Sequence, residues 1–161
     1  ELTFAPVSSS ELTDAIVPMM KQNLAAKDVM LSMHLAPATL YGDKDLLLSL
    51  LINLIDNARK ASSSGDTITV LGYSDNDYYC ISVQDTGKGI PADEIDKITK
   101  PFYMVDKSRA REQGGSGMGL ALCARIAALH GTTLQFASVP SQGTTVSFCL
   151  QKAGSQPEVE P

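Results

Sequence analysis

The sequence has no excess of positive charge and no long apolar run. Its formal net charge is −5 at pH 7, which argues against a nucleic-acid-binding domain, because neutralising phosphates requires a basic surface. No run of about 18 apolar residues occurs, and no basic, apolar leader stands at the start, so neither a transmembrane helix nor a secretion signal is expected. The sequence therefore predicts a cytoplasmic domain without nucleic-acid partners.

Cysteine is also scarce in this chain. The three cysteines, Cys80, Cys123 and Cys149, have no Cys-x-x-Cys spacing and lie inside apolar segments. This pattern favours buried free thiols over a zinc site or a disulfide framework.

What is present suffices for one globular domain. The chain has 161 residues, of which 43% are apolar and 19% are charged, so it can bury a substantial core. We expect this domain to span residues 1–150 and to be followed by a polar, disordered tail at 151–161. Because the first residue is Glu1 rather than Met, we also expect the chain to be a fragment of a longer protein.

Apolar spacing predicts three helices and five strands. Ser8 and Glu11 have the spacing of a capping box before a first helix, Asp43 is a plausible N-cap of a second, and a third is expected at about 117–130. Alternating or apolar runs predict strands at 29–35, 67–73, 78–83, 132–138 and 144–150. This order favours an α+β two-layer sandwich, in which a mixed, mostly antiparallel sheet of about five strands is covered on one face by the three helices.

The predicted second helix carries polar residues in one line. Asn53, Asn57 and Lys60 follow at helical spacing, which places two amides and an ammonium on one side of the helix. A solvated polar face would give the same pattern. The functional interpretation is a site for a hydrated Mg²⁺ ion and phosphates, because an amide oxygen suits Mg²⁺ and lysine supplies a point charge.

A second candidate segment is "VQDTGKGIP". A predicted strand ends at Asp85, and Gly87 and Gly89 allow either a close backbone approach or a positive φ. A hairpin exit would look the same. If Asp85 is buried, however, its carboxylate needs hydrogen-bond donors. The exocyclic amine of adenine supplies them, whereas guanine has a carbonyl there, so the site would prefer ATP to GTP.

A third candidate segment is "EQGGSGMGLAL" at residues 112–122, where the third helix begins. Exposed backbone N–H groups and the positive end of a helix favour an anion such as phosphate. No Gly-x-x-x-x-Gly-Lys-Ser/Thr pattern occurs, which excludes an ordinary P-loop enzyme. The basic stretch before it, with Lys107 and Arg109, is too long for a simple connection. It predicts a mobile lid over a triphosphate or, alternatively, a disordered charged loop.

Together and in this order, these segments resemble the N, G1, F and G2 boxes of the catalytic ATP-binding domain of bacterial sensor histidine kinases. That superfamily also contains gyrase and a heat-shock chaperone ATPase. The matching segments are "NLIDNARK" (53–60), "DTGKGI" (85–90), "PFYMVDKSR" (101–109) and "GGSGMGLAL" (114–122). The resemblance covers roughly residues 1–150 and implies the Bergerat α/β fold, with ATP between the helices and the lid.

The resemblance also implies roles for single residues. Asn57 would ligate Mg²⁺, Asp85 would hold adenine, and the glycines before the third helix would cradle the phosphates under the lid. The residues expected to bind ATP are Asn53, Asn57, Lys60, Asp85, Gly87, Gly89, Ile90, Tyr103, Lys107, Arg109, Gly115, Ser116, Gly117, Met118, Gly119, Leu120 and Thr144.

Two positions depart from the commoner pattern of this family. Met104 stands where many relatives carry a phosphate-binding arginine, and Ala61 stands where an aromatic residue or histidine is frequent. Delivery of positive charge to the phosphates would therefore rest on Lys107 or Arg109.

The resemblance implies phosphoryl transfer rather than hydrolysis. ATPases of the superfamily place a general-base glutamate where this chain has Asn53, and an amide cannot accept the proton of water. The two histidines, His34 and His130, are expected to be structural, so the chain would contain no catalytic residue of its own. The acceptor histidine would lie on a separate dimerisation domain.

The implied partners are this helical phosphoacceptor domain and a response regulator. The chain itself would be monomeric, and the full-length protein would be a homodimeric sensor kinase, anchored in a membrane, with this domain in the cytoplasm. Two alternatives remain open at this point. One is a Bergerat-fold protein serine kinase of the anti-sigma type, and the other is a non-catalytic ATP-binding regulatory module.

Overall fold

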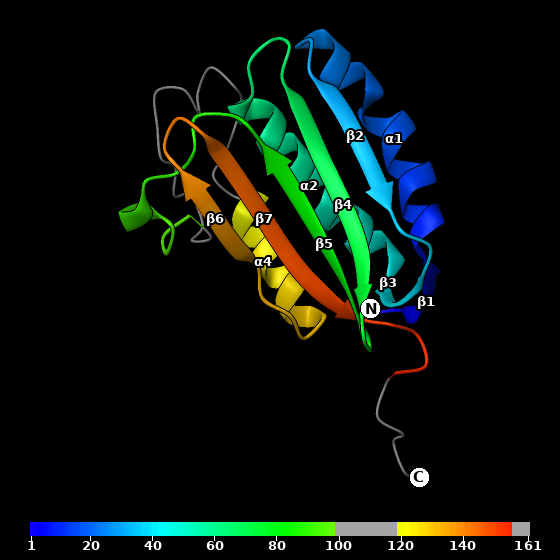
Figure 1. Cartoon of the computed structure of the whole chain (residues 1–161). Coiled ribbons are helices and arrows are strands. Elements are labelled where there is room, and N and C mark those ends of the chain that lie inside the picture. Colours follow the sequence, from blue (N-terminus) through cyan, green and yellow to red (C-terminus); the bar gives the residue numbers. More distant parts are fainter. Residues whose placement is uncertain (99–118, 156–161) are drawn as a thin grey trace.

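The computed structural model describes residues 1–98 and 119–155 (Figure 1). The elements in chain order are β1 (Phe4–Ser8), α1 (Ser9–Ala26), β2 (Met30–Leu35), β3 (Thr39–Asp43), α2 (Lys44–Ala61), β4 (Thr67–Asp75), β5 (Tyr78–Asp85), the 3₁₀ helix η1 (Ala92–Glu94), α4 (Gly119–Leu129), β6 (Gln135–Val139) and β7 (Gly143–Gln151).

The larger sheet has five strands in the order β2-β4-β5-β7-β6. β2 pairs with β4 in parallel, and the other neighbouring strands of this sheet pair antiparallel. The helices α1, α2 and α4 cover one face of the sheet, with α2 between the other two (Figure 1). The predicted α+β two-layer sandwich is confirmed.

Two helix starts are fixed by the side chains that the sequence indicates. The Ser8 hydroxyl accepts a hydrogen bond from the N–H of Glu11, and the Glu11 carboxylate accepts one from the N–H of Ser8. The Asp43 carboxylate accepts from the N–H groups of Thr3 and Leu46, at 2.9 and 3.1 Å. These two donors hold the pKa of the Asp43 carboxyl below its ordinary value. The predicted capping box and N-cap are confirmed.

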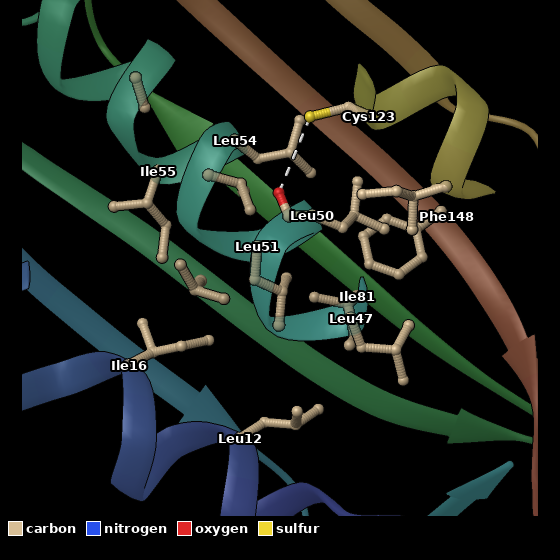
Figure 2. Packing of buried hydrophobic residues seen from close by; sticks show 14 of the residues in the cluster. Leu12, Ile16, Leu47, Leu50, Leu51, Leu54, Ile55, Ile81, Cys123 and Phe148 are labelled. Carbon is tan, nitrogen blue, oxygen red and sulfur yellow. Dashed lines mark hydrogen bonds between the residues drawn. The ribbon is translucent and has the colours of Figure 1, made fainter. Parts of the chain in front are cut away.

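The hydrophobic core lies between α2 and the sheet (Figure 2). The stripe that helical spacing predicts on α2 is buried, and side chains of α1, β5 and β7 pack around it. Burying one leucine of this kind stabilises the fold by about 1.5–3 kcal/mol. The buried stripe therefore fixes which face of α2 lies against the sheet. The labelled core residues are Leu12, Ile16, Leu47, Leu50, Leu51, Leu54, Ile55, Ile81, Cys123 and Phe148.

His130, just after α4, joins three elements at one end of the molecule. Its Nε2 accepts a hydrogen bond from the N–H of Asp43 at 3.1 Å, and its Nδ1 lies 2.9 Å from the carbonyl oxygen of Ile126. The ring stacks on Phe4 with 4.8 Å between ring centroids. Gly42 leaves room for the ring, because a Cβ there would lie 2.9 Å from two of its atoms. The expected structural role of His130 is confirmed.

Three features of the fold differ from the sequence-based expectation. β1 and β3 form a separate two-stranded antiparallel sheet that was not predicted, because both segments are short and lack clear alternation. β6 begins at Gln135 rather than at 132, because Gly131 and Thr132 still hydrogen-bond to α4. The expected disordered tail does not begin at 151. Gln151 ends β7, and the N–H groups of Lys152 and Ala153 donate to backbone carbonyls. Residues 156–161 lie outside the described part.

The expectation for the cysteines is wrong for two of the three. Cys80 on β5 and Cys149 on β7 are direct partners in the strand register and are joined by a disulfide bond. Strand pairing brings together positions that are 69 residues apart, and linear spacing cannot show this. Cys123 is a buried free thiol as predicted, and burial raises its pKa to about 12.

Among the helices of the described residues, none has the length and apolar character needed to cross a membrane.

Candidate functional site

A cavity of about 170 Å³ lies between α2, α4 and the adjoining ends of β5 and β7. Its walls are mainly apolar and a few polar groups converge on it, which is the usual character of a ligand site. Depressions of about 720, 510 and 480 Å³ elsewhere contain none of the residues predicted to bind ATP. The lining of the smaller cavity includes six of them, namely Asn57, Asp85, Gly89, Ile90, Leu120 and Thr144.

The amides of α2 face the start of α4. A Cβ added to Gly119, the first residue of α4, would lie 3.7 Å from Asn57 Oδ1 and 3.8 Å from Asn53 Oδ1. The Asn53 Nδ2 group donates to the carbonyl oxygen of Ser49 at 2.7 Å. The Asn57 Nδ2 atom is buried and has no hydrogen-bond partner among the described residues. The structure therefore brings the predicted amide pair to the positive end of a helix.

Lys60 does not line the cavity in the structure. Its Nζ lies 3.4 Å from Asp56 Oδ2, and the other carboxylate oxygen of Asp56 lies 2.8 Å from Arg59 Nη2. Lys60 is thus paired with an acid on its own helix. Its contact with phosphates stays a prediction.

Asp85 is buried at the end of β5, with 7% of its surface exposed. Its Oδ1 accepts a hydrogen bond from the N–H of Gly87 at 2.9 Å, and Thr144 lies opposite it in the register of β5 and β7. Burial raises the pKa of the Asp85 carboxyl, although the N–H groups of Gly87 and Thr144 act in the opposite direction. The condition that the sequence analysis set for Asp85, namely burial, is therefore met.

The glycines after Asp85 are needed for packing of the backbone. A Cβ at Gly87 would overlap the carbonyl oxygen of Ala61 at the end of α2, and a Cβ at Gly89 would overlap the carbonyl oxygen of Val139. Gly89 also has a φ of 72°, which side chains disfavour. The positive φ expected in this segment is confirmed at Gly89. The close approach at Gly87 is to the protein itself.

Ser138 on β6 is a site residue that the sequence analysis missed. Its hydroxyl accepts a hydrogen bond from the N–H of Ile90 at 2.7 Å and donates to the carbonyl oxygen of Gly143 at 3.0 Å. It also lies 2.9 Å from Thr144 Oγ1. A lone serine on a short strand carries no sequence signal for this role, because its three partners come from two other segments.

Seven of the predicted residues lie outside the described residues, and so does the lid proposed for residues 101–113. These seven are Tyr103, Lys107, Arg109, Gly115, Ser116, Gly117 and Met118. Their assignments stay predictions.

The donor set of the cavity fits the predicted magnesium ion. Within residues 1–98 and 119–155, no group of three His, Cys, Asp or Glu side chains could hold a metal. Mg²⁺ does not need such a group, because it keeps several waters and takes other ligands from phosphates. Asn57 supplies one buried amide, and within the described ranges its nitrogen has no hydrogen-bond partner. A half-turn of this amide would place the oxygen, which Mg²⁺ accepts, in the same position.

Comparison with known proteins places these features in a family. Residues 42–154 match the family described as histidine kinase-, DNA gyrase B-, and HSP90-like ATPase. The sensor histidine kinase WalK of Bacillus subtilis is 37% identical over 110 residues, which are 67% of this chain and 18% of WalK. The adaptive-response sensory kinase SasA of Synechococcus elongatus is 41% identical over 113 residues, which are 70% of this chain and 29% of SasA. The chain thus spans less than a third of the length of these relatives.

Solved structures show the same fold. The mycobacterial sensor histidine kinase MprB has a TM-score of 0.81 at 24% identity, over 93% of this chain and 98% of that chain. Full-length ShkA in complex with AMPPNP has a TM-score of 0.81 at 25% identity, over 95% of this chain and 32% of that chain. The domain fits the catalytic ATPase domain of a histidine kinase, and the chain belongs to the histidine kinase-, DNA gyrase B- and HSP90-like ATPase family.

Proposed function

We propose that the chain binds Mg-ATP in the 170 Å³ cavity and donates the γ-phosphoryl group to a histidine on a separate helical domain. The observation that carries this proposal is a pair of polar groups on the cavity walls. These are the buried Asp85 carboxylate and the amide of Asn57, whose nitrogen has no partner among the described residues. Native proteins leave few buried polar groups unpaired, so the Asn57 nitrogen, next to a cavity that also holds a buried carboxyl group, supports a bound ligand.

The base of the nucleotide would lie against Asp85. A carboxylate only accepts hydrogen bonds, and the exocyclic amine of adenine only donates them. Leu54, Val83 and Ile98 add apolar walls, which suit the faces of a purine ring. The positive end of α4 would then lie beside the phosphates. Mg²⁺, when bound at Asn57, would neutralise part of the phosphate charge.

The residues of the site favour transfer to a protein group over attack by water. Asn53 occupies the position where hydrolases of this superfamily carry a general base. Its amide nitrogen donates a hydrogen bond to the Ser49 carbonyl, and its amide oxygen cannot serve as a strong base. An imidazole acceptor needs no such base, because its neutral nitrogen is already nucleophilic.

The acceptor histidine would come from outside this chain. His130 is held by Asp43 and Ile126 through its two ring nitrogens, and His34 lies on β2, which the cavity does not reach. The proposed whole protein is a homodimeric sensor kinase with its own phosphoacceptor domain and a response regulator as partners. This chain is its ATP-binding domain on the cytoplasmic side.

Calorimetric titration with ATP, with and without Mg²⁺, tests the binding site. We expect Asp85→Asn to weaken ATP binding by about tenfold or more, because a hydrogen bond to a charged group is lost. Asn57→Ala should remove most of the Mg²⁺ dependence. Asp14→Asn and Asn23→Ala are matched controls, since both residues are exposed on α1. If both site variants bind Mg-ATP as tightly as the wild type, the site is assigned wrongly.

A transfer assay separates the proposed function from its alternatives. The chain is mixed with the histidine-bearing helical domain of its full-length protein and with ATP labelled on the γ-phosphate. An acid-labile, base-stable phosphoprotein is expected for a histidine kinase. Acid-stable label would instead support a serine kinase of the anti-sigma type. ATP binding without any transfer would support a regulatory module.

A further inference from the structure

Three hydrogen bonds converge on the hydroxyl group of Ser138. The partners are the N–H of Ile90 at 2.7 Å, the carbonyl oxygen of Gly143 at 3.0 Å and Thr144 Oγ1 at 2.9 Å. Ile90 and Thr144 line the cavity, whereas Ser138 lies behind them. Ser138 therefore links both walls without itself being a lining residue.

The number of hydrogens on these groups fixes the direction of each bond. A hydroxyl has one hydrogen to donate and two lone pairs that accept. The N–H of Ile90 can only donate and the carbonyl of Gly143 can only accept, so the single hydrogen of Ser138 points at Gly143. Its second lone pair is then left for the hydroxyl of Thr144. The three contacts are all hydrogen bonds only if Thr144 donates to Ser138.

This arrangement decides what Thr144 presents to a ligand. With its hydrogen directed at Ser138, the Thr144 oxygen has only lone pairs to offer toward the cavity. Asp85, its partner in the strand register, is also an acceptor. Both residues are buried, with 9% and 7% of their surface exposed, so water competes weakly for these groups. The side chains of Asp85 and Thr144 therefore both accept hydrogen bonds from a group in the cavity, and neither donates one.

We propose that Ser138 is a positioning residue that sets the base selectivity of the site. By holding the Thr144 hydroxyl as an acceptor, it favours a purine with an amino group at C6 over one with a carbonyl there. A carbonyl at C6 would face two acceptors and stay unpaired in a buried place, which is the costly case in ligand discrimination. This inference rests on the proposed function, since it needs a nucleotide in the cavity.

Without the Ser138 oxygen, the Thr144 hydroxyl loses its acceptor. It can then turn its hydrogen toward the cavity and donate to a carbonyl. Asp85 is unaffected, because its hydrogen bond from Gly87 does not involve Ser138. The variant Ser138→Ala should therefore lose the part of the preference for a C6 amino group that depends on Thr144. It should keep the part that depends on Asp85.

The test compares ATP with inosine triphosphate, which replaces the C6 amino group of adenine by a carbonyl, in calorimetric titrations of the 161-residue chain. We expect the wild type to prefer ATP. In Ser138→Ala the preference should fall by about three- to tenfold, the value of one neutral hydrogen bond, mainly through tighter binding of inosine triphosphate. Ser138→Thr keeps the hydroxyl and should restore the preference. Ser147→Ala, on the opposite face of β7, is the matched control and should leave it unchanged.

Several outcomes would overturn the inference. An equal loss of affinity for both nucleotides in Ser138→Ala would mean that Ser138 only supports the fold. A wild type that binds both nucleotides equally would refute the selectivity while leaving the proposed function intact, and one that binds neither would refute both. If Ser138→Ala does not fold, Thr144→Val replaces it. That variant should weaken ATP and spare inosine triphosphate, and an unchanged ratio would overturn the inference.

Discussion

The two ends of α2 differ in how their polar groups are satisfied. At its N-terminal end, Asp43 caps the helix, its carboxylate accepts from Thr3 and Leu46, and its N–H donates to His130. Toward its C-terminal end, Asn57 carries a buried amide nitrogen without a partner among the described residues. Among the described residues, the first arrangement satisfies its polar groups, and the second leaves one of them unpaired. The contrast therefore separates polar groups that stabilise the fold from a polar group that is left for the ligand proposed above.

The largest effect is expected beside the cavity, where the backbone of β7 lies close to the end of β5. Gly143 has a φ of 112°, and a Cβ there would overlap the carbonyl oxygen of Asp85. We expect Gly143→Ala to lower the free energy of unfolding by about 3 kcal/mol and to abolish ATP binding. Urea denaturation measures the first effect.

Gly65→Ala provides the control, because Gly65 has a φ of 89° but nothing within 4 Å of an added Cβ. Gly65→Ala isolates the conformational cost of placing a side chain at a positive φ, which is about 1 kcal/mol. If the two variants lose equal stability, the close contact at Gly143 is not what requires glycine.

The next largest effect is expected at the N-terminal end of α2, where His130 contacts Asp43. His130→Ala removes a hydrogen bond to the Asp43 N–H and the stacking on Phe4. We expect the free energy of unfolding to fall by about 2 kcal/mol while the affinity for ATP stays near the wild-type value. His34→Ala, on exposed β2 surface, should change neither quantity. A large loss of ATP affinity in folded His130→Ala would show that the two ends are coupled.

Two carboxyl groups extend the comparison to pH. The N–H groups of Thr3 and Leu46 lower the pKa of Asp43, so its charged form stabilises the fold above the ordinary value of 3.8, and this contribution is lost as the pH falls toward the lowered pKa. Burial raises the pKa of Asp85, so its protonated form fits the fold better, and its contribution falls as the pH rises through the raised pKa.

Urea denaturation at several pH values tests these opposite signs. The stability lead of the wild type over Asp43→Asn should shrink as the pH falls below 3.8. The stability of Asp85→Asn relative to the wild type should improve as the pH rises from 3.8 through the raised pKa of Asp85. Parallel pH profiles of the two variants would contradict the opposite pKa shifts assigned to Asp43 and Asp85.

The smallest effect on stability is expected at Asn57. Asn57→Ala should change the free energy of unfolding by less than about 1 kcal/mol, because the lost amide nitrogen has no partner in the described structure. Asn53→Ala, which loses the 2.7 Å bond to Ser49, should cost more. Thermal melts of both variants without nucleotide give the comparison. A greater loss for Asn57→Ala would mean that its amide serves the fold.

Local patterns determined much of this molecule. The capping box at Ser8 and Glu11, the Asp43 cap and the apolar stripe of α2 depend on neighbours within one or two helical turns, so the sequence shows them directly. The spacing of Asn53 and Asn57 likewise placed both amides on one side of α2, and the structure places both at the start of α4.

Only the tertiary structure decided which distant segments meet. The β1–β3 sheet, the Cys80–Cys149 disulfide and the bonds of Ser138 join positions far apart in the chain. No local period encodes such pairs, because strand register and helix packing are set by the burial of the whole core. The sequence by itself thus determined the helices, the strands of the larger sheet and the chemical types at the site, while long-range packing decided the burial of Asp85 and the direction in which Thr144 offers its oxygen.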